Sequence, residues 1–156
     1  MTDFALVRTG AGISSDIAAD PSTKQYQTET GLASAVRMSI YTRARAKPGD
    51  ELPSGDGSFG ENLGGYWAES LLDDGYQYGS RLWTLGRSKL TPETRQRARD
   101  FVVESLEWLT GLGIAREYEV ETEIAARGVL CFLVKVYREN EPPATFDYLW
   151  NFQGAT

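Results

Sequence analysis

The chain has 156 residues with 22 acidic and 16 basic side chains, and its net charge of -6 argues against general binding to nucleic acid. It contains no histidine, which excludes Ser-His and Cys-His nucleophile pairs and the usual transition-metal ligands. Its single cysteine, Cys131, excludes a disulfide framework. We expect one domain over residues 1–156, without a leader or a membrane span, made or assembled in a cytosol-like compartment.

Residues 1–28 are predicted to form an N-terminal hairpin arm. Phe4–Arg8 is short and apolar, and Asp16–Ala19 reads as its partner strand. The connection TGAGISS is rich in glycine, as are the loops that open dinucleotide sites, but no helix follows it and the third glycine of that pattern is missing. Turn chemistry is the better interpretation of Gly10 and Gly12.

An amphipathic helix is predicted over residues 30–44, with Thr30 as its N-cap. Its apolar face consists of Leu32, Ala35, Val36, Ser39 and Ile40. Arg43, Arg45 and Lys47 follow at the C-terminal end, where the helix dipole favours cations. A solvated helix end explains these charges without a phosphate partner.

Residues 48–65 form one long loop that is dense in Gly, Pro, Ser and Asp. Several of its residues fall at EF-hand positions, namely Asp50, Ser54, Gly55, Asp56, Ser58 and Glu61. However, Leu52 occupies a ligand position and Pro53 stiffens the loop, so a surface or partner-binding loop is favoured over calcium binding. Loops of this length in compact domains are usually functional or mobile.

The clearest helix is predicted over residues 92–110, after a short apolar helix around Trp83. Thr91 caps its start, Pro92 takes the first position, and Glu93 suits the positive end of the helix dipole. Its buried stripe consists of Ala98, Phe101, Val102, Ser105, Leu106 and Leu109. Six basic residues and one acid lie between residues 79 and 99, whereas acids outnumber bases ten to four between 100 and 147. Solvated faces of opposite sign, or docking against unlike neighbours, would both explain this asymmetry.

A three-stranded antiparallel meander is predicted over residues 114–152. Glutamates alternate with apolar residues from Ile114 to Ile124, which is typical of a half-buried strand. Val129–Tyr137 is nearly all apolar and is expected to be a central strand covered on both faces. Thr145–Phe152 is predicted as an edge strand. The fold class is therefore α+β: this meander plus the N-terminal hairpin, packed by the two main helices and short ones.

Five stretches of the chain are distinctive in combination: GLASAVRMSIYTRARA (31–46), GGYWAESL (64–71), GSRLWTLGRSKLTPETRQRA (79–98), ESLEWLTGLGIA (104–115) and YLW (148–150). With these stretches and the order of its elements, the chain resembles the small baseplate wedge proteins of Mu-like contractile-tailed phages. The family is similar, more distantly, to the sheath-initiating wedge subunits of other contractile tails and of type VI secretion baseplates. That wider family often carries Glu-Pro-Arg where residues 110–113 stand here, so the contact made by that tripeptide is not carried over.

The resemblance implies a structural protein rather than an enzyme, without a cofactor, a nucleic-acid partner or a membrane. It implies six copies around the tail tube, docked to larger wedge scaffold subunits and possessing strand edges for the first ring of sheath protein. Tube or hub proteins are further possible neighbours. The expected location is the tail baseplate of the virion, after assembly in the host cytoplasm.

For the interface, we expect the basic residues Arg81, Arg87 and Lys89 to meet acidic neighbours. Trp83, Tyr148 and Trp150 are candidate anchors, although a Trp in so small a domain is more often part of the core.

Two rival functions are a glycan hydrolase that uses two carboxylates, tested at Asp56 and Glu61, and a module that binds calcium or a small ligand.

Overall fold

The computed structural model describes residues 31–53, 63–67 and 78–152, together with the backbone of four short strands nearer the N-terminus. The chain divides into two compact units, residues 1–38 and 39–156, and the expectation of a single domain stays a prediction. In the first unit β1 (Asp3–Phe4) pairs with β4 (Thr28–Glu29), and β2 (Leu6–Arg8) pairs antiparallel with β3 (Ser15–Ile17). This second pair matches the expected hairpin. Its glycine loop lies outside the described residues.

Helix α1 (Leu32–Tyr41) is shorter than the helix expected over residues 30–44. The amide of Ala35 donates to the carbonyl of Gly31, so the helix starts from Gly31, whose φ of 84° lies outside the helical region. Thr30, the expected cap, lies outside the described residues. Of the expected apolar face, Val36, Ser39 and Ile40 are buried. Leu32 and Ala35 are half-buried.

Three antiparallel strands form the main sheet, in the order β5 (Glu117–Ala126), β6 (Val129–Tyr137) and β7 (Ala144–Asn151). This confirms the predicted α+β fold with a C-terminal meander. The pairing of β6 with β7 is regular over its whole length, whereas β5 shifts register against β6 between Ile124 and Ala126. Such a bulge bends a strand and interrupts its ladder.

Helix α2 (Pro92–Ser105) begins as predicted, with the hydroxyl of Thr91 accepting from the amide of Thr94 at 3.2 Å. The single helix expected over residues 92–110 is divided in two, because the chain leaves the helical conformation at Leu106 and resumes in α3 (Trp108–Gly111). Ser105 donates its hydroxyl to the carbonyl of Val102 at 2.8 Å, and serines that bond backward in this way often bend helices. No helix of the described residues is long and apolar enough to cross a membrane.

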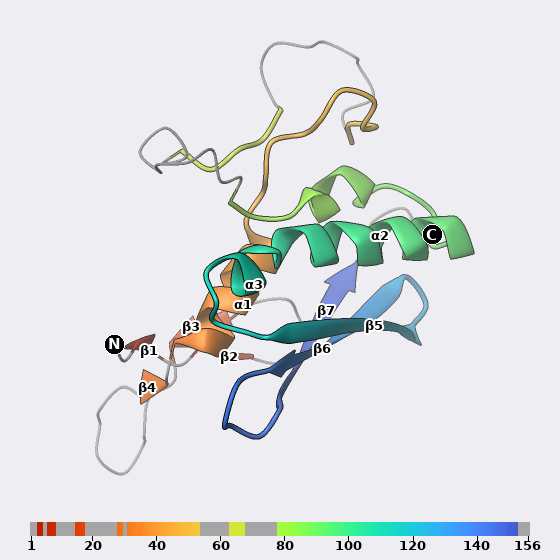
Figure 1. Cartoon of the computed structure of the whole chain (residues 1–156). Coiled ribbons are helices and arrows are strands. Elements are labelled where there is room, and N and C mark those ends of the chain that lie inside the picture. The colour runs from red at the N-terminus through yellow and green to blue at the C-terminus, as the bar shows by residue number, and fades with distance from the viewer. Residues whose placement is uncertain are drawn as a thin grey trace. The chain divides into compact units, whose positions relative to one another are not determined.

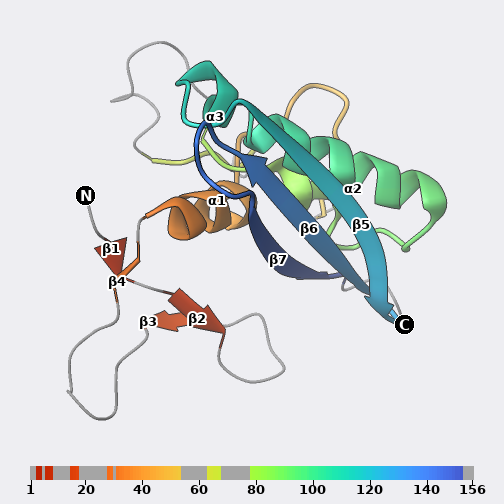
Figure 2. The ribbon, with the colours of Figure 1, turned by 60° about the horizontal axis from the view of Figure 1, so that its bottom comes forward.

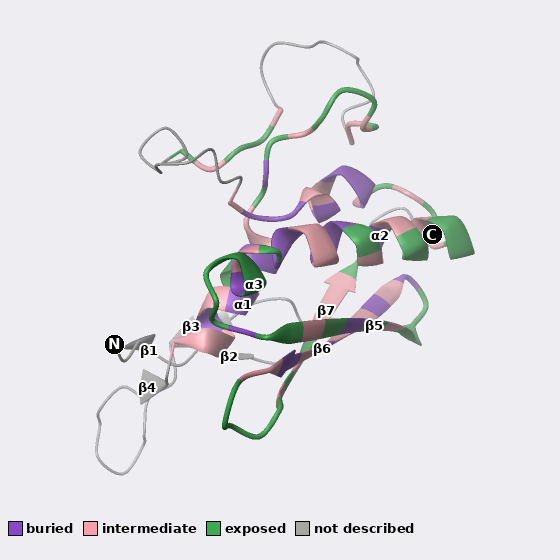
Figure 3. Ribbon diagram, viewed as in Figure 1, coloured by how far each residue is buried: buried purple, intermediate pink, exposed green. Residues whose placement is uncertain are grey.

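The core lies between α2 and one face of the main sheet, called the inner face (Figures 1 and 3). Its buried side chains are Ala98, Phe101, Val102, Leu106, Leu109, Val120, Leu130, Phe132, Val134 and Val136. Two polar contacts tie α2 to β5: the guanidinium of Arg99 donates to the carbonyl of Val120 at 2.9 Å, and the hydroxyl of Tyr118 donates to the carbonyl of Val103 at 3.0 Å.

The expectation that the central strand is covered on both faces is wrong. Burial alternates along β6, and the residues that point away from α2 are only half-buried. We call the side of the sheet opposite α2 the outer face; it is turned toward the viewer in Figure 2. An apolar central strand therefore has one face in the core and one face toward solvent.

Candidate assembly interface

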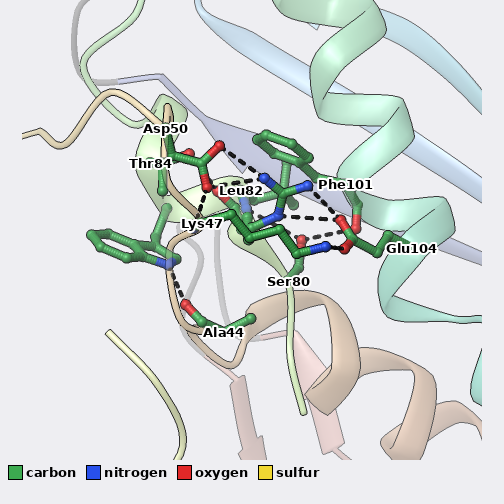
Figure 4. Close-up of polar contacts among 10 residues, drawn as sticks. Ala44, Lys47, Asp50, Ser80, Leu82, Thr84, Phe101 and Glu104 are labelled. Atoms are coloured by element: carbon green, nitrogen blue, oxygen red, sulfur yellow. Dashed lines mark hydrogen bonds and ion pairs between the residues drawn. The ribbon is translucent and has the colours of Figure 1, made fainter. Parts of the chain in front are cut away.

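Four charged side chains meet where the 3-10 helix η3 (Arg81–Leu85) approaches α2. Arg81 donates through Nη1 to both carboxylate oxygens of Asp50, at 2.8 and 2.9 Å, and through Nε and Nη2 to one oxygen of Glu104, at 3.2 and 2.6 Å. The Nζ of Lys47 also bonds to Glu104. Figure 4 shows this ion-pair cluster of Lys47, Asp50, Arg81 and Glu104.

Arg81 and Asp50 are largely removed from solvent, with 14% and 8% of their side chains exposed, whereas Lys47 and Glu104 remain 46% and 32% exposed. The guanidinium also lies over the Phe101 ring, 4.2 Å from its centroid. Burial opposes the charge of Arg81, but hydrogen bonds with Glu104 and Asp50 outweigh it and raise the pKa of Arg81. Burial likewise opposes ionisation of Glu104, yet hydrogen bonds from Lys47 and Arg81 hold the pKa of Glu104 below its usual value. Both shifts favour the charged forms of Arg81 and Glu104.

The backbone before η3 positions Arg81. The amide of Ser80 donates to the carbonyl of Thr42 at 2.9 Å, and the carbonyl of Ser80 accepts from Ala44 at 3.1 Å, so the two segments run side by side. Gly79 fits this approach, because a Cβ at this residue would lie 2.5 Å from the carbonyl oxygen of Thr42. Its φ of 101° also favours glycine.

The long loop is closed at its base. The amide of Ala46 donates to the carbonyl of Leu63 at 2.7 Å, and the amide of Gly65 donates to the carbonyl of Arg43 at 3.2 Å. Trp83 completes the closure, since its indole N–H donates to the carbonyl of Ala44 at 2.8 Å. We call residues 43–46, 63–65 and Trp83 the loop base. It joins η3 to both ends of the loop.

The six side chains expected at the interface lie in different places. Arg81 is within the ion-pair cluster and Trp83 is in the loop base, so both make contacts inside the chain. Arg87 and Lys89 are exposed after η3, and no ion pair joins either to another described residue. This pair is the part of the expected basic segment that is available to a neighbour.

Tyr148 and Trp150 lie on the inner face of β7, next to the end of α1. Tyr41 stacks on Trp150 with 6.1 Å between ring centroids and meets Tyr148 edge-on at 6.2 Å. The hydroxyl of Tyr41 donates to the carbonyl of Leu149 at 2.6 Å. Tyr148 is buried and Trp150 is half-buried, so Trp150 is the more accessible of the two.

The outer edge of β7 has backbone groups that no described strand pairs with. The amide of Phe152 donates to the carbonyl of Gly128, so this even-numbered residue directs its N–H toward β6. Successive residues of a strand direct their backbone N–H and C=O groups to opposite sides. Because the β6–β7 register is regular, the odd-numbered residues of β7 direct their N–H and C=O groups to the free edge. Tyr41 occupies one of these carbonyls, that of Leu149.

Comparison with known proteins gives the chain its family. The model of the family described as phage protein GP46 matches residues 32–143. The chain belongs to this family. It is 34% identical to baseplate protein gp46 of Escherichia phage Mu over 155 residues, which cover 99% of each chain. It is also 32% identical to the Mu-like prophage FluMu protein gp46 of Haemophilus influenzae over 98 residues, or 63% of this chain and 62% of that one.

Membership of the GP46 family confirms the resemblance to Mu-like phage baseplate proteins that the sequence motifs indicated. The matched range includes α1, the loop base, the ion-pair cluster and strands β5 and β6. The match to the phage Mu protein extends over nearly the whole chain. The sequence match to the family therefore covers both the helices and the first two strands of the main sheet.

Sequence reasoning missed the partners of Arg81. Asp50 and Glu104 are 31 and 23 residues away from Arg81, so no local spacing could have paired them. Asp50 stood at the first position of the possible calcium loop, but both of its carboxylate oxygens accept hydrogen bonds from Arg81. Asp56 and Glu61, the carboxylates of the hydrolase hypothesis, lie outside the described residues. In the described ranges no group of three or more Cys, Asp or Glu residues is arranged to hold a metal ion.

Proposed function

We propose that this chain is a structural wedge component of a contractile-tail baseplate, not an enzyme, and that it initiates the sheath by strand pairing at the edge of β7. The likeness to the phage Mu baseplate protein over the whole chain supports the baseplate role. In this proposal, six copies surround the tail tube in the virion. Each copy docks to larger wedge scaffold subunits and contacts sheath protein, with tube or hub proteins nearby.

The observation that carries the strand-pairing role is the contrast between the two edges of the main sheet. β5 contains a bulge, and Arg99 of α2 already donates to its Val120 carbonyl. β7 is regular over its eight residues, contains no proline, and directs the N–H groups of Thr145, Asp147, Leu149 and Asn151 to the free edge. A regular edge with unpaired backbone groups is suited to accepting a strand from another chain.

The exposed basic pair Arg87 and Lys89 is proposed to meet an acidic scaffold neighbour. Trp150 is proposed as an anchor beside the β7 edge, because it is half-buried and its indole nitrogen is buried without a hydrogen-bond partner. Arg81 and Trp83 would then contribute indirectly, by holding the loop base in shape. Tyr148 would support Trp150 from the core.

A proline at Thr145 tests the edge. Thr145→Pro removes one N–H from the free edge while every hydrogen bond to β6 is kept, and proline is tolerated on edge strands. Thr145→Ala is the matched control, since it removes the same exposed side chain but keeps the N–H. With both variants folded by circular dichroism, we expect particles assembled with the Thr145→Pro chain to lack sheath, and particles with Thr145→Ala to carry it. Normal sheath on the proline variant would contradict strand pairing at β7.

Quantitative mass spectrometry of purified tail particles tests the baseplate role itself. The measurement is the copy number of this chain relative to the spike and sheath proteins. We expect six copies per particle. Absence of the chain from intact particles would overturn the structural proposal.

A further inference from the structure

The outer face of the main sheet has an apolar centre. β6 reads VLCFLVKVY, a composition typical of a strand that is covered on both sides. The structure buries only alternate residues against the core and leaves Val129, Cys131 and Leu133 half-buried on the outer face. Leu149 of β7 lies directly opposite Cys131 and is also half-buried. These four side chains form the apolar centre.

Carboxylates flank this centre on both sides. The rim consists of Glu117, Glu119, Glu121 and Glu123 on β5 and Asp147 on β7, all of them exposed. The strand register places Leu133 between Glu121 and Asp147. Lys135 is the one basic residue among the outward-pointing residues of the three strands, and it bonds to Glu121 at 2.8 Å. The outer face is therefore strongly negative around an apolar centre.

This combination indicates a binding surface. Protein interfaces place apolar contacts at the centre and polar groups at the rim, and unlike charges across the rim accelerate and orient docking. The partner that matches this face has an apolar patch flanked by lysines or arginines. A second copy of this chain matches less well, because the solvent side of helix α2 has no excess of basic residues and no apolar centre: its exposed residues are Pro92, Glu93, Arg95, Gln96 and Asp100.

We propose that the outer face docks a different protein of the assembly, one whose surface has an apolar centre between basic side chains. The inference rests on the proposed baseplate function, and it adds a second contact that is separate from strand pairing at β7. The first contact would use backbone groups at the edge of the sheet, and the second would use side chains on its outer face. In this proposal the face is accessible in the free chain and covered in the assembled baseplate.

Carboxyl footprinting with carbodiimide and glycine ethyl ester tests the proposal. The full chain is labelled alone, at two concentrations, and within purified tail particles, and labelling at each acid is quantified by mass spectrometry. We expect the five rim carboxylates to react readily in the free chain and several-fold more slowly in particles. Equal labelling in both would overturn the proposal. Slow labelling of the rim carboxylates in the free chain would also overturn the proposal. If this protection increases with protein concentration, a second copy of the chain covers the face; if it does not, another part of the same chain covers it.

Charge reversal gives the second test. The variant is Glu121→Lys with Glu123→Lys, and its matched control is Asp100→Lys with Glu107→Lys, which makes the same charge change at exposed acids away from the outer face. In competition with wild-type chain, we expect the rim variant to be incorporated into particles about tenfold less well and the control to compete equally. Equal incorporation of both variants would overturn the docking face.

The two proposals fail in different ways. A chain that is absent from particles contradicts the baseplate function. A chain that is present in particles with its rim carboxylates still reactive contradicts only the docking face.

Discussion

The ion-pair cluster and the outer face of the sheet both carry charge, but they use it in opposite ways. In the cluster, Arg81 and Lys47 meet Asp50 and Glu104, and the central pair of Arg81 and Asp50 is largely buried. On the outer face, five carboxylates accompany one lysine and remain in water. The first arrangement holds distant segments of the chain together, whereas the second leaves a charged surface for a neighbour.

This difference shows why total charge is a poor guide to an interface. Arg81 belongs to the basic stretch expected to meet acidic neighbours, yet its guanidinium is used inside the chain. Charges that are already paired and buried are costly to separate, and charges that are exposed and unbalanced are available for recognition. Stability measurements on the free chain should separate the two regions.

Removal of Arg81 should have the largest effect. Arg81→Ala leaves the buried Asp50 carboxylate without its guanidinium, and breaking a buried pair in this way costs about 3–5 kcal/mol. Urea denaturation gives the free energy of unfolding. The control is Arg87→Ala, an exposed arginine without an ion pair in the described residues, which should change stability by less than about 0.5 kcal/mol. Similar small losses in both variants would contradict the importance of the cluster.

The close approach at Gly79 should rank second. Gly79→Ala combines a φ of 101° with a Cβ only 2.5 Å from the Thr42 carbonyl, so we expect a loss of about 2–3 kcal/mol. Gly49 offers a matched control, because its φ is 96° but its Cβ would meet no atom within 4 Å. Gly49→Ala should therefore cost only about 1 kcal/mol of backbone strain. Thermal and urea unfolding of both variants would detect the difference, and equal losses would argue against the close approach.

The pH dependence of Glu104 should give a smaller effect. The pKa of Glu104 is lower in the folded chain than in the unfolded chain. Its ionised form therefore stabilises the fold fully at a pH above the pKa of the unfolded chain, and this stabilisation is lost as the pH falls through the pKa of the folded chain. Because Glu104 is partly exposed, we expect Glu104→Gln to lose about 1 kcal/mol at pH 7. The gap between variant and wild type should close as the pH falls below the usual glutamate pKa of 4.5. A gap that stays constant as the pH falls would contradict the ion pair.

The outer face should show the smallest effect in the free chain. The pair Lys135–Glu121 is exposed, so Lys135→Ala should leave the free energy of unfolding unchanged within the error of the measurement. Calorimetry of the free chain at low and high salt checks this. A loss as large as that of Arg81→Ala would show that the two regions do not differ as described.

Local patterns predicted much of the fold. Alternation along β5, the apolar run of β6 and the cap at Thr91 all act over a few residues, so the strands and the start of α2 could be predicted from the sequence. The break at Leu106 could not, because a single serine-to-backbone bond competes with an otherwise helical pattern. The apolar run of β6 also could not show that one of its faces is open.

The candidate site was harder to predict than the fold. A lysine or arginine in a sequence is most often solvated, so Arg81, Arg87 and Lys89 looked alike. What separates them is the long-range contact that Arg81 makes with Asp50 and Glu104. Contacts of this kind depend on how the elements pack, and no spacing along the chain encodes them.

The closed loop base has a consequence for how such proteins diverge. Because the backbone bonds at Ala46 and Gly65 bring the two ends of the loop to neighbouring points, the stretch after Asp50 can change while Lys47 and Asp50 keep their ion pairs with Glu104 and Arg81. Each doubling of such a stretch adds only about 0.6 kcal/mol of closure entropy. We therefore expect the sequence and length of this loop to vary among related proteins, which would let each adapt to new neighbours while the helices and the sheet keep their structure.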